Sequence, residues 1–299
     1  MKRPKLVTEG RNSRSENIDR QSVEEILETI NAEDQQVPVS IAKHTQVIAE
    51  IVKTVVAQMK QGGRLFYVGA GTSGRIGVLD ASEIPPTYGT SPELVQAIIA
   101  GGEQAVFRAI ENVEDNEALG SEEIVSRHIT SADVVMGITA SGGASYVIGA
   151  LKKSSRIGAK TIAFTNNQNA PLHEYGDHVL AIDVGPEVVM GSTRMKAGTS
   201  QKLVLNMITT ATMIQLGKVY ENLMVDVQPV NKKLIERSKA MIQYATDCDE
   251  QQADLLFKTS GKKPKVAIVM GLLQVSKDEA EQLLEKNGGY IYRVVDDDQ

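Results

Sequence analysis

Short apolar runs alternate with helix-like segments between residues 63 and 185, and this alternation limits the possible fold more than any other feature. Five such runs can be read in the sequence: GRLFYVGAG, ELVQAIIAGG, DVVMGITAS, KTIAFTNN and HVLAIDVG. Strands that alternate with helices pair in parallel through right-handed crossovers. The sequence therefore predicts an α/β fold with a doubly wound, mostly parallel sheet flanked by helices.

The segments between and after these runs have the apolar spacing of helices. We predict helices near residues 74–82, over 103–113 and over 144–158, the last of them closed by Gly158. The stretch 199–217 is apolar nearly all round, which predicts a buried central helix. The core must be aliphatic, because the 299 residues include only four Phe and no Trp.

The two ends of the chain differ from this central region. Residues 1–20 are polar and aperiodic, which indicates an extended arm. Ser22 and Glu25 form a capping-box pattern, and the apolar residues that follow predict a helix with one buried face. A second helix is expected over 39–60. We therefore expect an arm with helices over 1–60, a central α/β domain over 61–230, and a small helical region of about three short helices over 231–299.

Composition excludes several classes of function. A net charge of -6 and a pI near 5.4 argue against nucleic acid as a partner, because binding its phosphate backbone needs a cationic surface. The single cysteine, Cys248, excludes an internal disulfide framework and fits a reducing compartment. No apolar run is long enough for a membrane span, and the basic N-terminus has no apolar stretch of the signal-peptide kind. We expect a cytoplasmic protein without membrane contact.

The loop after the first apolar run contains a glycine fingerprint. Residues 69–74, GAGTSG, fit the G-x-G-x-x-G pattern of dinucleotide-binding proteins. That reading also needs an acidic residue about 20 positions further on, at the end of the second strand, to hold the ribose hydroxyls. Here the second run ends in two glycines, and Glu103 lies 34 residues after Gly69. The pattern therefore does not indicate a nucleotide site.

A second loop of similar composition favours a different ligand. The third run leads into SGGAS, so two strands each end in a glycine-containing loop with hydroxyl side chains that opens a helix. Backbone N–H groups at a helix start attract anions, and serine or threonine hydroxyls add donors that suit a phosphate monoester. The alternative is that these serines only cap their helices. The candidate phosphate-binding residues are Thr72, Ser73 and Gly74 in the first loop and Ser141, Gly142 and Ser145 in the second.

Several longer motifs resemble one known family. TEGRNSRSENID, INAEDQQV, GRLFYVGAGTSGRIGVLDASEIPPTYG, GPEVVMGSTRMKAGTSQKLVLNMITTA and GKVYENLMVDV are similar to stretches of the N-acetylmuramic acid 6-phosphate etherases. These belong to the sugar isomerase (SIS) group, in which the glucokinase regulatory proteins are their nearest relatives. The resemblance implies cleavage of the lactyl ether of N-acetylmuramic acid 6-phosphate, giving N-acetylglucosamine 6-phosphate and D-lactate. It also implies a homodimer, a role in cell-wall sugar recycling, and no metal or redox cofactor.

The resemblance also assigns two catalytic residues, Glu83 as the acid that protonates the ether oxygen and Glu114 as the base at C2. An elimination of this kind needs one protonated and one ionised side chain. Glu83 is followed by IPP, and these apolar neighbours are expected to desolvate it, raise its pKa and keep it protonated. For the base, the residues alone leave Glu111, Asp115 and Glu117 open beside Glu114.

Two further features leave alternatives. The family usually has Ser-Gly-Arg-Thr-Pro in the second loop, where this chain has Ser-Gly-Gly-Ala-Ser, so the contacts of that loop with a ligand differ. Arg194 and Lys196 stand near the start of the central helix, where the helix dipole disfavours cations, which suggests a bound anion or a salt bridge to Glu187 or another acid. A non-catalytic sugar-phosphate regulator and an aldose–ketose isomerase are the other functions that this scaffold suits.

Overall fold

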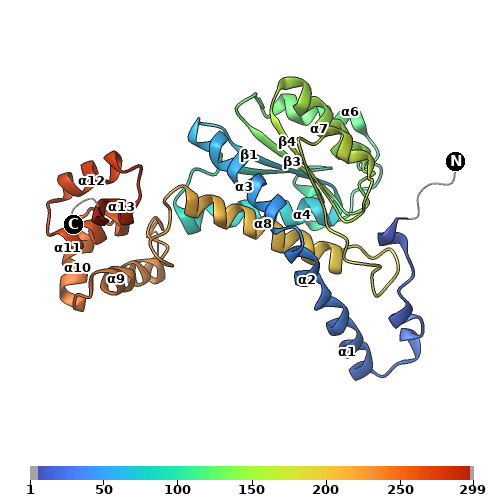
Figure 1. Cartoon of the computed structure of the whole chain (residues 1–299), viewed down its shortest axis with the longest axis horizontal. Helices are drawn as coiled ribbons and strands as arrows, with labels where there is room; N and C mark the ends of the chain where they lie inside the picture. Colours follow the sequence, from blue (N-terminus) through green and yellow to red (C-terminus); the bar gives the residue numbers. More distant parts are fainter. Residues whose placement is uncertain (1–5, 230, 297–299) are drawn as a thin grey trace. The chain divides into compact units, whose positions relative to one another are not determined.

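The computed structural model describes residues 6–229 and 231–296. It contains a five-stranded parallel sheet with the order β2-β1-β3-β4-β5 (Figure 1). Each of the five predicted runs forms one strand, so the predicted α/β fold with a parallel sheet is confirmed. The strands are β1 (Leu65–Gly69), β2 (Val95–Ile99), β3 (Val134–Thr139), β4 (Lys160–Thr165) and β5 (His178–Ala181).

The side of the sheet on which each new strand is added changes between β1 and β3. The chain runs from β1 outward to β2 and then returns to place β3 on the other side of β1. Gly69 at the end of β1 is level with Ile138 near the end of β3, so the two following loops leave the same edge of the sheet. Ligands of doubly wound folds bind in the crevice at such a reversal.

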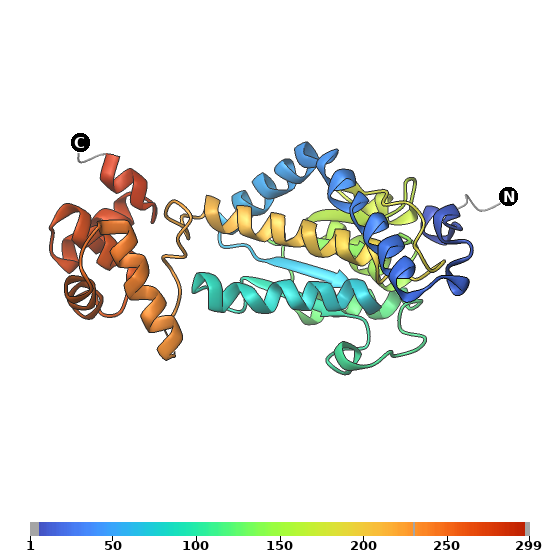
Figure 2. The same ribbon diagram turned by 90° about the horizontal axis from the view of Figure 1, so that it is seen from below.

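Helices cover both faces of the sheet. Helices α6 (Glu117–Ser126) and α7 (Ser145–Ile157) lie on one face, and α3 (Thr45–Lys60) with the first parts of α4 (Gly71–Tyr88) and α8 (Lys196–Gln215) lies on the other (Figure 1, Figure 2). Because both faces are covered, β1 and β3 are buried along their whole length. The core between the sheet and α7 is largely aliphatic, as predicted, and includes Val68, Val135, Val147 and Leu151.

A buried polar network fastens α4 to the sheet and to α8. The Tyr67 hydroxyl on β1 donates to Asp80 Oδ2 at 2.9 Å, and Asn206 Nδ2 on α8 donates to Asp80 Oδ1 at 2.6 Å. Burial raises the pKa of Asp80, and the hydrogen bonds from its partners oppose that rise. The network fixes the position of α4, and with it the loop after β1.

Several predicted helices have different bounds in the structure. The predicted 39–60 helix is divided into α2 (Gln36–Ala42) and α3, and the predicted 103–113 helix is reduced to α5 (Gln104–Phe107). Helix α6 was not predicted, although Asn116 caps it by accepting from the Leu119 N–H. The buried central helix is confirmed as α8.

The N-terminal region combines a confirmed helix start with a wrong burial prediction. Helix α1 (Val23–Asp34) begins with the complete capping box of Ser22 and Glu25. Its apolar residues Val23 and Leu27 are 67% and 59% exposed, whereas the charged Glu33 is only 5% exposed. The predicted apolar face is thus only partly buried within this chain, through Ile26 and Ile30, and the most buried residue of α1 is the charged Glu33. The preceding arm forms three short 3-10 turns, η1 (Val7–Glu9), η2 (Ser13–Ser15) and η3 (Ile18–Arg20).

The chain divides into two compact units, one of residues 1–82 and 93–209 and the other of residues 83–92 and 210–299. The three regions expected from the sequence, 1–60, 61–230 and 231–299, stay a prediction. The second unit has an apolar core of its own, which includes Val225, Ile242, Phe257 and Ile268. Over the described residues 231–296 there are five helices, where about three were expected: α9 (Lys232–Thr246), α10 (Glu250–Thr259), α11 (Pro264–Leu273), α12 (Lys277–Lys286) and α13 (Ile291–Asp296).

Among the described residues, no helix has the length and apolar character required to cross a membrane. The first unit also contains the short 3-10 helix η4 (Pro171–Tyr175).

Candidate functional site

A cavity of about 210 Å³ opens at the sheet edge where β1 and β3 end. Its walls come from the N-terminal arm, the loop after β1, the loop before α6, the end of β3 and the loop before α8. This is the crevice at the reversal of strand order, where a ligand is expected. The lining residues are Glu9, Ala70, Gly71, Thr72, Ser73, Glu114, Thr139, Ala140, Ser141 and Thr193.

The first loop presents hydroxyl groups at the start of a helix. Helix α4 begins at Gly71, whose φ of +52° favours glycine. No described residue hydrogen-bonds to the hydroxyls of Thr72 or Ser73. These two hydroxyls and the free N–H groups of the first turn of α4 can therefore bind an anion such as a phosphate group.

The glycine fingerprint of this loop has a packing role. A Cβ atom on Gly74 would lie 2.6 Å from Ile99 Cγ1 and 2.8 Å from the Gly69 carbonyl oxygen. Only glycine lets α4 start this close to the ends of β1 and β2. Gly74 was predicted as a phosphate-binding residue, but it does not line the cavity, and its N–H donates to the Ala70 carbonyl.

The second loop contributes one of its three predicted residues to the cavity. Ser141 lines it, and its hydroxyl accepts from the Gly143 N–H at 3.2 Å. Gly142 has a φ of +78° and packs against Ala170, and neither Gly142 nor Ser145 is among the described lining residues. The N-cap of α7 is Ala144, so no serine side chain caps this helix.

A backbone hydrogen bond holds Glu114 in place. Its carbonyl accepts from the Tyr146 N–H at 2.9 Å, which ties the loop before α6 to the first turn of α7. Burial, and secondarily the charge of Asp115, raises the pKa of the Glu114 carboxyl above its usual value of 4.5. Although the residue as a whole is exposed, it lines the cavity beside the loop that carries Thr72 and Ser73, and a carboxyl with a raised pKa in this place can act as a base.

The other three acids of this segment do not line the cavity. Glu117 pairs with Lys152 at 2.9 Å on the surface of α6 and α7. Glu111 and Asp115 are exposed and absent from the described lining. Of the four acids that the sequence left open, the structure therefore brings only Glu114 to the loops that carry Ser73 and Ser141.

Glu83 has a different environment from the predicted one. It lies inside α4, ten residues beyond Ser73, because the helix continues through Pro85 and Pro86 to Tyr88. The neighbouring Ile84 is buried, but Glu83 itself is exposed, so the expected desolvation is absent within the chain. Glu83 is not among the described residues that line the cavity.

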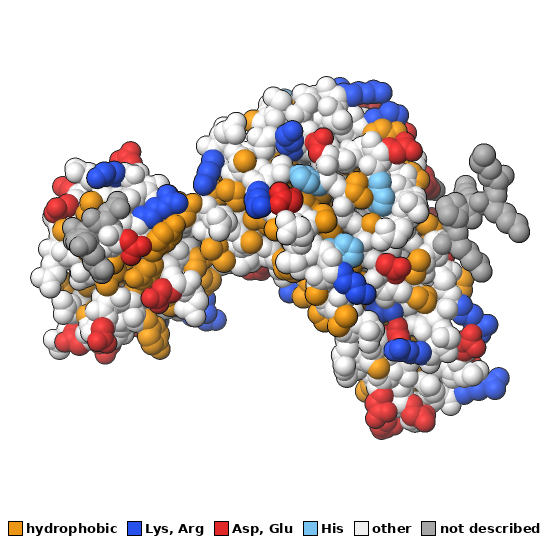
Figure 3. Space-filling view, viewed as in Figure 1, with side chains coloured by type: hydrophobic (Ala, Val, Ile, Leu, Met, Phe, Trp, Pro, Cys, Tyr) orange, Lys and Arg blue, Asp and Glu red, His pale blue; other side chains and the backbone are white. Residues whose placement is uncertain are grey.

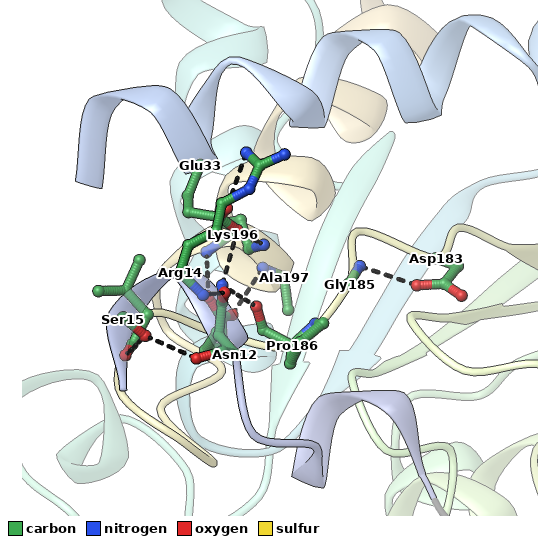
Figure 4. Close-up of polar contacts among 11 residues, drawn as sticks. Asn12, Arg14, Ser15, Glu33, Asp183, Gly185, Pro186, Lys196 and Ala197 are labelled. Atoms are coloured by element: carbon green, nitrogen blue, oxygen red, sulfur yellow. Dashed lines mark hydrogen bonds and ion pairs between the residues drawn. The ribbon is translucent and has the colours of Figure 1, made fainter. Parts of the chain in front are cut away.

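The cation at the start of α8 is neutralised by the protein itself (Figure 4). Lys196 is buried, and its ammonium group pairs with Glu33 Oε2 at 2.5 Å. Burial acts to raise the pKa of Glu33, but the hydrogen bonds from Lys196 and Asn12 outweigh it and lower that pKa. Glu187 accepts the backbone N–H groups of Lys196 and Ala197, both at 2.9 Å. For Lys196 the salt-bridge alternative is therefore correct, with Glu33 as the partner of its ammonium group.

Comparison with curated proteins identifies the family. The chain is 49% identical to N-acetylmuramic acid 6-phosphate etherase 2 of Lactiplantibacillus plantarum, over 97% of this chain and 98% of the relative. It is 50% identical to N-acetylmuramic acid 6-phosphate etherase of Clostridioides difficile, over 96% of this chain and 94% of the relative. The chain belongs to the N-acetylmuramic acid 6-phosphate etherase family.

Domain-level comparisons place this etherase family member in the SIS group. The family model described as glucokinase regulatory protein N-terminal SIS domain matches residues 47–155, and the SIS domain model matches residues 112–211. A solved structure from Bacteroides fragilis NCTC 9343, of a protein proposed to be a phosphosugar isomerase involved in capsule formation, has a TM-score of 0.50 at 18% identity. It covers 66% of this chain and 94% of its own, and at this identity it shows the fold alone.

Six lining residues of this etherase family member lay outside the sequence predictions, and three of them have polar side chains. Thr139 and Thr193 come from the end of β3 and from the loop before α8. Glu9 comes from the arm, whose polar and aperiodic sequence gives no sign of where it packs. The only signal in the sequence for a role of Glu9 was its place in TEGRNSRSENID, one of the motifs that resemble the family.

Proposed function

We propose that this protein is a carbon–oxygen lyase that cleaves the D-lactyl ether of N-acetylmuramic acid 6-phosphate. The products are N-acetylglucosamine 6-phosphate and D-lactate. The observation that carries the proposal is the cavity that combines the hydroxyls of Thr72, Ser73 and Ser141 with the raised pKa of Glu114. Membership of the etherase family supports the same reaction.

The phosphate group is assigned to the hydroxyl end of the cavity. The first turn of α4 supplies N–H donors and the helix dipole, and the side chains supply O–H donors. The described lining contains no lysine or arginine, so these neutral donors hold the anion. The sugar then extends toward Glu114.

Glu114 is assigned as the base. With the sugar ring open, the C1 aldehyde makes the C2 proton acidic, and the Glu114 carboxylate removes it. The C3–O bond breaks with its electron pair on oxygen, which takes a proton from an acid and leaves as D-lactate. Water then adds across the resulting C2–C3 double bond, with hydroxyl at C3 and a proton returned to C2.

Glu83 is assigned as that acid, supplied by a second copy of the chain in a homodimer. The support is that Glu83 is exposed and does not line the cavity of its own chain. Exposed apolar side chains fit the presence of a second copy: Val23, Leu27 and Val39 are all more than half exposed, and Figure 3 shows hydrophobic side chains at the surface near α2. The single cysteine and this reaction fit a cytoplasmic location.

The direct test is release of D-lactate from N-acetylmuramic acid 6-phosphate. The wild-type protein is expected to release it, and Glu83→Gln and Glu114→Gln are each expected to lower kcat by a factor of about 1000 or more. In heavy-oxygen water the label must enter the sugar at C3, whereas label in lactate would refute elimination. Tight substrate binding without lactate would favour the sugar-phosphate regulator, and interconversion of aldose and ketose phosphates would favour the isomerase.

A further inference from the structure

The N-terminal arm places a second carboxylate in the cavity of Glu114. Glu9 lines it together with Ser73, Ser141 and Glu114. We propose that Glu9 is a substrate-binding residue that accepts hydrogen bonds from the O–H and N–H groups of the sugar. The inference rests on the proposed function only in that the ligand is a sugar phosphate.

The arm is fastened to the cavity edge immediately before Glu9. Asn167 Oδ1 accepts from the Val7 N–H at 2.7 Å, and Asn167 Nδ2 donates to Thr8 Oγ1 at 2.8 Å. The same amide nitrogen donates to the carbonyl of Ala140, a cavity residue, at 2.8 Å. Thr8 and Asn167 are both 1% exposed. A buried amide that is hydrogen-bonded on both sides holds the arm in one path.

The arm is fastened again immediately after Glu9 (Figure 4). Asn12 Nδ2 donates to Glu33 Oε2 at 2.8 Å and to the Pro186 carbonyl at 3.1 Å. Ser15 Oγ donates to the Val188 carbonyl at 2.7 Å. Because Glu33 also pairs with the buried Lys196, this second anchor joins the arm, α1 and the start of α8. Glu9 therefore lies between two anchors of buried polar side chains.

The Glu9 carboxylate itself has no partner within the described chain. No hydrogen bond or ion pair of its oxygens is formed there, although Oε2 lies close to Gly191, 3.5 Å from where a Cβ would stand. The arm is thus held by hydrogen bonds on both sides of Glu9, while the Glu9 carboxylate forms neither a hydrogen bond nor an ion pair within the described residues. Such an arrangement fits a side chain that serves a ligand.

Charge decides which part of the ligand Glu9 contacts. A carboxylate repels a phosphate group. The phosphate is therefore assigned to the neutral N–H and O–H donors at the start of α4 and of Ser141, away from Glu9. An ionised carboxylate only accepts hydrogen bonds, so it pairs with sugar O–H or amide N–H groups. Glu9 is therefore expected to favour sugar phosphates over phosphate alone, which offers no such groups at that position.

Calorimetric titration with two ligands tests this assignment. N-acetylglucosamine 6-phosphate fills both ends of the cavity, and inorganic phosphate fills only the hydroxyl end. Glu9→Ala is expected to weaken binding of the sugar phosphate about tenfold or more, and Glu9→Gln less, because hydrogen bonds to a charged acceptor are the stronger ones. Binding of inorganic phosphate is expected to remain within about twofold of wild type. Glu16→Ala, an exposed glutamate of the same arm, is the matched control and should change neither affinity.

The possible outcomes separate the role of Glu9 from the identity of the enzyme. Equal weakening of both ligands by Glu9→Ala would show a structural role for the arm, and no weakening of either would show that Glu9 does not touch the sugar. Both results overturn the proposal. If the wild-type protein releases no lactate but Glu9→Ala still weakens sugar phosphate binding selectively, the proposed reaction fails and the assignment of Glu9 stands.

Discussion

At the scale of single residues, the environment of Glu114 links activity to stability. Its pKa in the folded chain is raised above 4.5, mainly by burial. A carboxyl with a raised folded pKa contributes stability that is complete below the unfolded value and is lost as the pH rises through the folded value. The ionised carboxylate that the proposed role of Glu114 as a base requires is therefore the form that the fold favours less.

Glu114→Gln is accordingly expected to be inactive but no less stable than wild type at about pH 7, because the glutamine has no charge to desolvate. Urea unfolding of both proteins at about pH 4 and about pH 7 measures this, and any gap in favour of the variant should close at the lower pH. The acidic limb of the wild-type kcat/KM profile should lie above pH 4.5. A variant that is less stable than wild type only at neutral pH would contradict the assignment.

At the scale of elements, the site depends on how closely α4 begins to the sheet. Gly74→Ala adds a Cβ that meets Ile99 and the Gly69 backbone below 3.0 Å, so the start of α4 must move away from the strands. We expect the free energy of unfolding to fall by about 1–3 kcal/mol. Lactate release should fall with it, because Thr72 and Ser73 move with the helix.

Gly143→Ala is the matched control for this change. A Cβ there meets only Ser141 Oγ, at 3.8 Å, and Gly143 does not have a positive φ. Its free energy of unfolding should stay within about 0.5 kcal/mol of wild type. If Gly74→Ala behaved in the same way, close packing would not be the reason for the glycine. Chemical denaturation and a lactate assay on both variants decide the point.

At the scale of the whole molecule, the proposed homodimer makes a quantitative prediction. Glu83→Gln and Glu114→Gln are mixed in equal amounts, unfolded and refolded together. If Glu83 of one copy serves Glu114 of the other, each mixed dimer has one complete site and one site without either glutamate. Random pairing makes half of the dimers mixed, so about a quarter of wild-type activity should return. No recovery, with mixed dimers verified by mass spectrometry, would place both glutamates in one chain's site.

The sequence correctly indicated the elements whose signals are local. Alternating apolar runs gave all five strands, Ser22 and Glu25 gave the start of α1, and the long apolar stretch gave α8. Each of these signals lies within one element, because apolar periodicity and helix capping depend only on residues a few positions apart. The 103–113 prediction failed because its spacing is helical but Phe107 is 90% exposed, so tertiary packing supports only one turn there.

The sequence by itself determined the parallel α/β fold, the two hydroxyl-bearing loops and, through its motifs, the etherase family. Only the tertiary structure shows that Glu114, of four neighbouring acids, lines the cavity, that Gly74, Gly142 and Ser145 are outside the described lining, and that Glu83 is exposed. It also brought Glu9 to the cavity, through contacts with Asn167 and Glu33 that span up to 160 residues. The physical reason is that cavity walls are made of side chains distant in sequence, and their burial and hydrogen bonds exist only after the chain has folded.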